Sequence, residues 1–427
     1  MFYTRDRGGR GGGSPLREFR TSEARGRVMD SDSQDAAWFR ATTLAERIAS
    51  VRALGHAQQS AEANADVAGR GLLQWRSQPP FTNTSMFARR LATEGITEGE
   101  FLGLLGEPLE SVRARFQDIP PWLRVLSRAL GDHSLPNPVP LPTSLTKEPA
   151  VGFLNSIEPL LGHGLNRFRK QAQELIRRRP DAPLGSANLE AIFLSDLPPQ
   201  LLTMLSRTLV LELNVARLEG VLDGATPQDR FQSFVECLRR PEIRLRILRE
   251  YPVLARQLII RIDQWVRFVL EFLERLCTDW DVIRHTFGAG KEPGVLEHLQ
   301  TGAGDRHRMG RSVVISEFSS GLRLVYKPRS MAADIHFQEL VKWFNQRGIL
   351  PALRALEILD RSTYGWVEFV AAGSCDSEPA LSRFYERQGA YLALLHLLAA
   401  TDFHCENVIA AGEDPVLVDL EAMTFSQ

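Results

Sequence analysis

A short loop near the C-terminus carries side chains whose types and spacing suit phosphoryl transfer. In residues 401–407, TDFHCEN, four residues separate Asp402 from Asn407. At this spacing the carboxylate can reach a substrate hydroxyl while the amide, one tight loop later, reaches a metal ion on the phosphates. Twelve residues beyond Asn407 an apolar run ends in Asp419, where a second hard oxygen ligand for Mg²⁺ would lie. The loop that contains Asp402 and Asn407 and the apolar run that ends in Asp419 together predict a site that transfers a phosphoryl group to a hydroxyl.

Protein kinases space the base and one metal ligand of their catalytic loop in the same way, H-R-D-x-x-x-x-N, and carry a second metal ligand in D-F-G. The later tripeptide here is Asp419-Leu420-Glu421, which departs from D-F-G. Taken alone, the Asp402–Asn407 loop or the run that ends in Asp419 also fits a β-hairpin with polar residues near its ends. Their order, with a lysine upstream, favours the catalytic interpretation. His404 fits a site residue or an ordinary loop histidine.

The elements that must position this loop begin with a hairpin. Two β-rich runs, Ser312–Phe318 and Leu322–Lys327, are separated by a Ser-Ser-Gly turn, and Pro328 stops the second run. A lysine at this strand end can neutralise phosphate oxygens of ATP. A helix predicted over about 332–347 carries Glu339, which can orient the ammonium. The alternatives are a solvated strand end for the lysine and a solvated helix face for the glutamate.

Further elements complete the order expected of a kinase-like core. Two strands are predicted at about Leu353–Asp360 and Tyr364–Val370, and a helix over about Pro379–Ala400 leads into the Asp402 loop. Ahead of the hairpin, Gly302–Arg311 is a polar loop punctuated by glycine. It can cover phosphates, although it is not the G-x-G-x-x-G pattern.

Most of the N-terminal region has helical periodicity. Long helical segments are predicted at Phe153–Ile176, Leu201–Leu222, Phe231–Tyr251 and Pro252–Phe272, the last running on toward Ile283. Thr97–Glu100 fits a helix cap, and a proline-rich stretch at 135–142 marks a seam. We therefore expect an α+β protein in three parts: an extension over 1–35, a helical region over 36–299 and a kinase-like core over 300–427.

The first 28 residues are rich in arginine and glycine, so they cannot supply a core and are expected to be disordered. One interpretation is an RGG-type tail that binds RNA. The other, which we favour, is an upstream extension translated in error, with Met29 as the true start.

Composition argues against several classes of function. The chain has 427 residues, 44% of them hydrophobic, which suits two or three packed domains. A formal net charge of −1 gives no general attraction to nucleic acid or to an anionic membrane. The four cysteines are scattered without a C-x-x-C pair, which argues against a disulfide framework or a zinc site. The sequence has no apolar run of membrane-spanning length and no signal peptide, so a cytoplasmic location is expected.

Several co-linear motifs between residues 300 and 421 resemble the dehydratase domain of class II lanthipeptide synthetases. The motifs are GDRHRMGRSV at 304–313, LVYKPRS at 324–330, YGWVEF at 364–369, TDFHCEN at 401–407 and LVDLE at 417–421. The helical region is similar to the same family more loosely. Members use ATP to phosphorylate Ser and Thr of a precursor peptide and then eliminate the phosphate, giving dehydroalanine and dehydrobutyrine. Their fold is similar to that of lipid kinases.

The resemblance implies a phosphorylation site that uses ATP and Mg²⁺ and takes a precursor peptide as its partner. Its catalytic residues would be Asp402 and His404, and its Mg²⁺ ligands Asn407, Asp419 and Glu421. The candidates for binding ATP are Lys327, Glu339 and Arg311.

The resemblance also implies a second, eliminating step. Asp305 and His307 match an Asp-x-His pair that the family uses there. Elimination needs a base for the α-proton and stabilisation of the leaving phosphate, which suits these residue types.

Members of the family continue beyond the position of Glu421 with the rest of the dehydratase and a zinc-dependent cyclase. We therefore expect a fragment, or one piece of a split enzyme whose missing segment another chain supplies, poorly soluble and unable to dehydrate a peptide by itself. Two other classes stay open. A different kinase-like phosphotransferase would phosphorylate without elimination, and a non-catalytic, peptide-binding pseudo-enzyme would not bind Mg-ATP.

Overall fold

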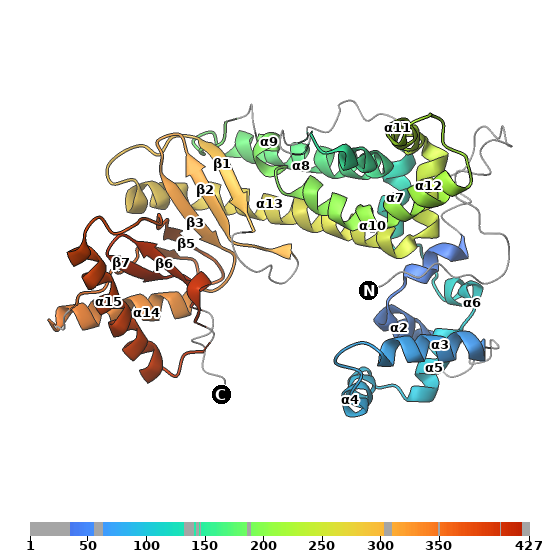
Figure 1. Cartoon of the computed structure of the whole chain (residues 1–427), viewed down its shortest axis with the longest axis horizontal. Coiled ribbons are helices and arrows are strands. Elements are labelled where there is room, and N and C mark those ends of the chain that lie inside the picture. The colour runs from blue at the N-terminus through green and yellow to red at the C-terminus, as the bar shows by residue number, and fades with distance from the viewer. Residues whose placement is uncertain are drawn as a thin grey trace. The chain divides into compact units, whose positions relative to one another are not determined.

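The computed structural model describes residues 35–54, 63–131, 141, 145, 147–185, 189–302, 310–348, 351–401 and 403–420. The chain forms two compact units, each assembled from two separate stretches. Unit 1 contains the residues up to Arg167 and Leu197–Asp263, and unit 2 contains Phe168–Asp196 and everything from Gln264 onward. Two helices, α8 (Glu158–Arg178) and α13 (Pro252–Phe287), therefore contribute residues to both units (Figure 1).

All the regular secondary structure described in unit 1 is helical. Besides parts of α8 and α13, it contains η2 (Ala36–Ala41), α2 (Leu44–Leu54), α3 (Ala65–Arg76), α4 (Thr84–Glu94), α5 (Glu98–Gly106), α6 (Leu109–Ala114), α7 (Pro121–Gly131), η4 (Pro149–Ile157), α10 (Leu197–Leu218), α11 (Pro227–Cys237) and α12 (Pro241–Glu250). The predicted cap at the start of α5 is confirmed, because Thr97 and Glu100 form a reciprocal capping box. Phe87 and Phe101 pack edge to face, with ring centroids 5.7 Å apart, in the core behind it.

One predicted helical segment of this unit is divided into two helices. The apolar pattern over Phe231–Tyr251 predicted a continuous helix, whereas the structure has α11 and then α12. Pro241 is the first residue of α12, and Arg240 before it is extended, with φ −76° and ψ 126°. A proline disfavours helical backbone at the preceding residue, so the chain stops and restarts there.

Unit 2 is organised around an antiparallel sheet. In the described residues its strands are β1 (Leu296–Thr301), β2 (Val314–Phe318), β3 (Arg323–Lys327), β4 (Ile358–Asp360) and β5 (Gly365–Glu368), in the spatial order β1-β2-β3-β5-β4. The other elements are α9 (Leu189–Phe193), α14 (Ala332–Gln346), α15 (Glu378–Leu397) and a separate hairpin of β6 (Val408–Ala411) and β7 (Asp414–Leu417). The predicted hairpin at β2 and β3, both helices and the later hairpin are confirmed. Helices with a small antiparallel sheet agree with the expected α+β class, and the kinase-like core stays a prediction.

The C-terminal half of α13 packs against the sheet. Phe272 on α13 meets Tyr326 on β3 edge to face, with ring centroids 5.2 Å apart. Arg275, one helical turn later, donates a hydrogen bond to the Tyr326 hydroxyl. Burial raises the pKa of Tyr326 to about 12, so this phenol stays neutral at physiological pH. The strand that carries Lys327 is thereby fixed from one side by a long helix.

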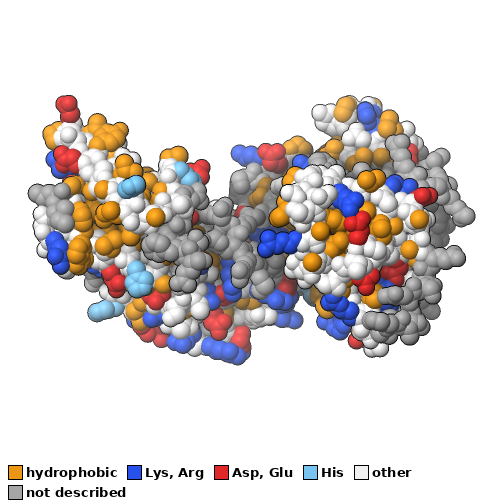
Figure 2. Space-filling model, turned by 90° about the horizontal axis from the view of Figure 1, so that it is seen from below, with side chains coloured by type: hydrophobic (Ala, Val, Ile, Leu, Met, Phe, Trp, Pro, Cys, Tyr) orange, Lys and Arg blue, Asp and Glu red, His pale blue; other side chains and the backbone are white. Residues whose placement is uncertain are grey.

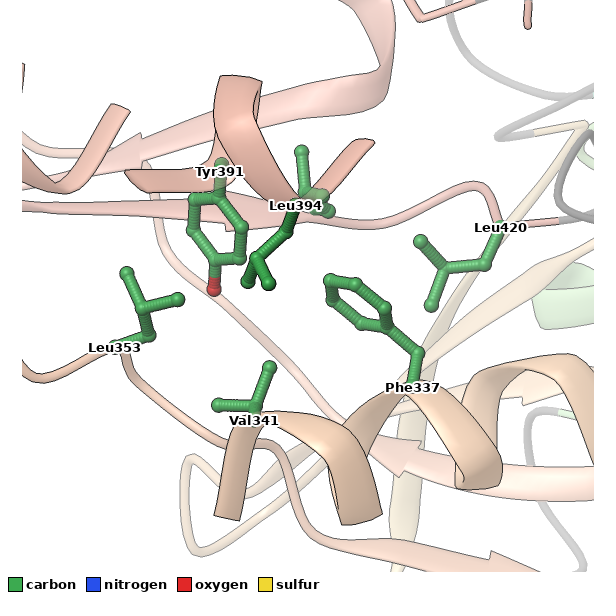
Figure 3. Close-up of a cluster of buried hydrophobic side chains, with 7 residues drawn as sticks. Phe337, Val341, Leu353, Tyr391, Leu394 and Leu420 are labelled. Carbon is green, nitrogen blue, oxygen red and sulfur yellow. The ribbon is translucent and has the colours of Figure 1, made fainter. Parts of the chain in front are cut away.

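A second core holds α14, α15 and the β6–β7 hairpin together. Phe337 and Val341 of α14 point toward Tyr391 and Leu394 of α15 (Figure 3). The same cluster includes Leu353, Leu417 and Leu420. Because Leu417 and Leu420 flank Asp419, burying them fixes the backbone on both sides of this predicted metal ligand.

Large apolar side chains also remain in solvent on α15. Tyr385, Leu392 and Leu397 are well exposed there, and apolar side chains gather on the part of the surface at the left of Figure 2. In the described part of the chain, every helix is too short or too polar to cross a bilayer.

Candidate functional site

Lys327 is the buried cation of the candidate site. It ends β3 and is 8% exposed. Its ammonium lies 2.8 Å from the Oδ1 atom of Asp334 and donates a second hydrogen bond, of 2.7 Å, to the main-chain carbonyl of Val418. Asp334 occupies the first turn of α14, where the helix dipole favours a carboxylate. A strand, a helix and the segment after β7 therefore converge on one ammonium.

The partner of Lys327 differs from the expected one. Glu339 was expected to orient the ammonium, but its side chain is 67% exposed and its carboxylate lies 3.1 Å from Nδ1 of His336. Glu339 lies five residues beyond Asp334, about 140° away around the helix axis. Since Phe337 and Val341 turn the other side of α14 into the core, Glu339 faces solvent. Asp334 makes the contact that the sequence assigned to Glu339.

The β6–β7 hairpin brings two predicted metal ligands to its open end. Its register pairs Val408 with Leu417, so Asn407 and Val418 are the next pair outward. The amide of Val418 donates a hydrogen bond of 3.0 Å to the carbonyl of Asn407. Asp419 follows at once, with a side chain 58% exposed. Because the Val418 carbonyl accepts from Lys327, this end of the hairpin lies at the ammonium.

Arg329 is a site residue that the sequence interpretation missed. Its Nη1 atom donates to Oδ2 of Asp334 at 2.7 Å, and its Nη2 atom lies 3.9 Å from Oδ1 of Asp419. The available signal was the place of Arg329 in the LVYKPRS motif, two residues after Lys327. Two cations thus share the Asp334 carboxylate, one on each oxygen.

His404 shapes the loop ahead of Asn407. Its Nδ1 atom accepts a hydrogen bond of 3.3 Å from the amide of Glu406, and its carbonyl accepts one of 3.0 Å from the amide of Asn407. These bonds close the short turn η6 (Cys405–Asn407). His404 therefore has a structural role in the turn, and its predicted catalytic role stays a prediction.

Arg311 is held by α13. Its Nη2 and Nε atoms donate to Oε2 of Glu271 at 2.8 and 3.1 Å. A direct contact with nucleotide would have to share or replace this ion pair, and the predicted ATP-binding role of Arg311 stays a prediction.

Four predicted site residues lie outside the described part of the chain. They are Asp305, His307, Asp402 and Glu421. Their proposed roles rest on sequence alone.

The chemistry of the described residues fits a nucleotide-bound magnesium ion. Asp419 and Asn407 offer hard oxygen atoms, the ligand type that Mg²⁺ prefers. Among the described residues, no three His, Cys, Asp or Glu side chains form a cluster that could hold a metal. Mg²⁺ bound with nucleotide needs only one or two carboxylates because phosphates and water supply the rest. These oxygen ligands therefore suit a Mg²⁺ ion that is also coordinated by phosphates and water better than a metal ion held by protein side chains alone.

Comparisons with known proteins agree with the motifs. A family model described as a domain of unknown function, DUF4135, matches residues 251–427. The lacticin 481/lactococcin biosynthesis protein LcnDR2 of Lactococcus lactis subsp. lactis is 28% identical over 248 residues, which cover 55% of this chain and 26% of that protein. The chain thus spans about a quarter of the length of the relative that it matches. Together with the motifs around Lys327, Asn407 and Asp419, these matches support a similarity of this chain to class II lanthipeptide synthetases.

Proposed function

We propose that the chain takes part in lanthipeptide biosynthesis as the part of a dehydratase that phosphorylates Ser and Thr of a precursor peptide with ATP. The observation that carries the proposal is the position of the buried Lys327 ammonium. It lies between Asp334 and the carbonyl of Val418, the residue before Asp419, at the open end of the hairpin that begins after Asn407. A buried ammonium beside exposed hard oxygen ligands is an arrangement suited to a metal–phosphate group.

Each residue would have one task in phosphorylation. Lys327 would neutralise phosphate oxygens, with Asp334 keeping its ammonium directed. Asp419 and Asn407 would hold Mg²⁺, which supplies charge neutralisation on the phosphates when it is bound. Asp402 would accept the proton of the attacking Ser or Thr hydroxyl.

The elimination step would use different residues. Asp305 and His307 are the candidates for removing the α-proton and stabilising the departing phosphate. The name of the lactococcal relative refers to biosynthesis of lacticin 481 and lactococcin. By analogy, we propose a lanthipeptide precursor as the substrate of this chain.

The test is ligand-dependent stabilisation of the 427-residue chain. If the site binds Mg-ATP, nucleotide at 100 times its dissociation constant stabilises the fold by about 2.7 kcal/mol. Lys327→Ala and Asp419→Ala should each reduce the shift in melting temperature. Lys342→Ala is the matched control, because this lysine lies on α14 with a side chain 51% exposed. An unchanged shift in both site variants would remove these residues from the nucleotide site.

The reaction itself is tested with a precursor peptide and Mg-ATP. Mass spectrometry should detect phosphopeptide, and dehydrated peptide is expected only when the rest of the dehydratase is supplied. Phosphorylation with no dehydration, even when a full-length relative supplies the rest of the enzyme, would instead favour a different phosphotransferase.

A further inference from the structure

We propose that Arg329 is a positioning residue that holds Asp419 before a divalent cation binds and yields to that cation when nucleotide arrives. In this arrangement Arg329 keeps its hydrogen bond to the carboxylate of Asp334 before and after the cation binds. The inference rests on the proposed function, and it adds a contact that phosphoryl transfer does not itself require.

The geometry makes the two ends of the guanidinium unequal. One end is firmly bound, because Nη1 donates to Asp334 at 2.7 Å and to the carbonyl of Ser330 at 3.0 Å. The other end reaches Asp419 across 3.9 Å, which is an ion-pair distance rather than a close hydrogen bond. Arg329 therefore can lose its contact with Asp419 without losing its anchor.

Burial makes Asp334 a suitable anchor. Its side chain is 5% exposed, against 18% for Arg329 and 58% for Asp419. A buried carboxylate needs compensating charge, and here Lys327 and Arg329 each occupy one of its oxygens. Pro328 between the two cations restricts the backbone that joins them. The rigid part of the cluster is thus Lys327, Asp334 and the inner end of Arg329.

The balance of charge in this cluster favours replacement of the Arg329 guanidinium at Asp419 by a divalent cation. Lys327 and Arg329 together neutralise Asp334 and Asp419 in the cluster that the structure describes. A divalent cation on Asp419 would compete with the adjacent guanidinium for the same carboxylate. The planar guanidinium, released on that side but still anchored to Asp334, matches the geometry of phosphate oxygens. Arg329 would then move from the metal ligand to the nucleotide.

This exchange predicts opposite changes in two affinities when Arg329 is replaced. Without the guanidinium, Asp419 loses a competing positive charge, so Mn²⁺ alone should bind more tightly. The expected gain is roughly fivefold, the effect of one charge pair about 4 Å apart in water. ATP without metal should bind more weakly, because a phosphate partner is lost. A residue that only supported the fold would weaken both.

The experiment compares wild type, Arg329→Gln and Arg329→Lys in the 427-residue chain. Mn²⁺ binding is measured by electron paramagnetic resonance, with Asp419→Asn defining the signal that belongs to this carboxylate. Metal-free ATP binding is measured by calorimetry. The matched control is Arg354→Gln, which removes a half-exposed arginine paired with Glu368 at 3.6 Å in the same unit.

The expected result is tighter Mn²⁺ and weaker ATP binding for Arg329→Gln, with Arg354→Gln equal to wild type. Arg329→Lys keeps the charge but cannot span both carboxylates, so it should retain more ATP affinity than Arg329→Gln. Affinities that fall together, or do not change, overturn the role of Arg329 while the proposed function stands. A wild-type chain that binds neither Mn²⁺ nor ATP overturns the proposed function and this inference with it.

Discussion

Asp279 on α13 accepts a hydrogen bond of 2.8 Å from the indole of Trp366 on β5. The same carboxylate accepts one of 2.7 Å from Nε of Arg361. Trp366 pairs with Tyr326 across the sheet, and the next pair is Lys327 with Gly365. The buried carboxylate therefore fixes the strand beside the one that carries Lys327.

Replacing Asp279 should destabilise unit 2. Asp279→Ala would leave the fully buried Trp366 N–H without its acceptor and the Arg361 guanidinium without its ion pair. A loss of about 3 kcal/mol in the free energy of unfolding is expected, the usual effect of removing one side of a buried charged pair. Urea denaturation followed by tryptophan fluorescence measures it. Asp281→Ala, on the same helix but with a side chain 82% exposed, should change stability by less than about 0.5 kcal/mol.

Replacing Asp334 should weaken nucleotide binding and phosphorylation much more than replacing Glu339. Asp334→Asn removes the charge that holds Lys327, so both the Mg-ATP melting shift and the rate of peptide phosphorylation should fall, the rate by roughly tenfold or more. Glu339→Gln changes an exposed carboxylate on the same helix and should leave both measurements near wild type. The reverse pattern would restore Glu339 as the functional partner of Lys327.

The cysteines provide a local probe of the site. Cys405 is exposed in the turn before Asn407, whereas Cys277 is buried in α13. Burial raises the pKa of Cys277 to about 11, so at pH 8 only about one in a thousand of its thiols is ionised. Iodoacetamide should therefore modify Cys405 much faster than Cys277, as peptide mass spectrometry would measure. Mg-ATP should slow the modification of Cys405, and equal rates with and without nucleotide would argue against binding next to this turn.

Mutation should separate the two proposed half-reactions when this chain is tested together with the remaining segments of a full-length relative. His307→Ala should still phosphorylate the precursor, so phosphopeptide should accumulate because the elimination step is blocked. Asp402→Asn should give neither phosphopeptide nor dehydrated product, since it removes the proposed base of the first step. Mass spectrometry of the peptide over time distinguishes these results. Normal dehydration by His307→Ala would remove this histidine from elimination.

Local patterns predicted the elements that carry the site. The β2–β3 hairpin, α14, α15 and the β6–β7 hairpin each show their periodicity within a short window. The order of Lys327, Asn407 and Asp419 along the chain also predicted that the end of β3 would lie near the end of the later hairpin, and the Lys327 ammonium does contact the carbonyl of Val418 there. A shared catalytic site of these three side chains stays a prediction.

Other features depend on contacts that no short window contains. β1 was missed because a bulge lies between Leu296 and His298, so its buried leucines, Leu296 and Leu299, are spaced as on a helix. Asp334 and Arg329 were missed because their partnership depends on how α14 turns back onto the end of β3. Sequence order identified the lysine, and only the fold identifies its counter-ion.

The division of α8 and α13 between the units affects how this protein can be dissected. The family model begins at residue 251, yet unit 2 also requires Phe168–Asp196. Phe193 in that stretch packs on Phe272 and offers its carbonyl to the indole of Trp265, and Pro183 offers its carbonyl to the amide of Leu296 at the start of β1. A gene fragment begun at residue 251 would lack Phe193, so Phe272 would lose this ring contact and the indole of Trp265 would lose its hydrogen-bond acceptor. The segment that the family model matches is thus smaller than the piece of chain that should be expressed, or exchanged between homologues, for unit 2 to fold.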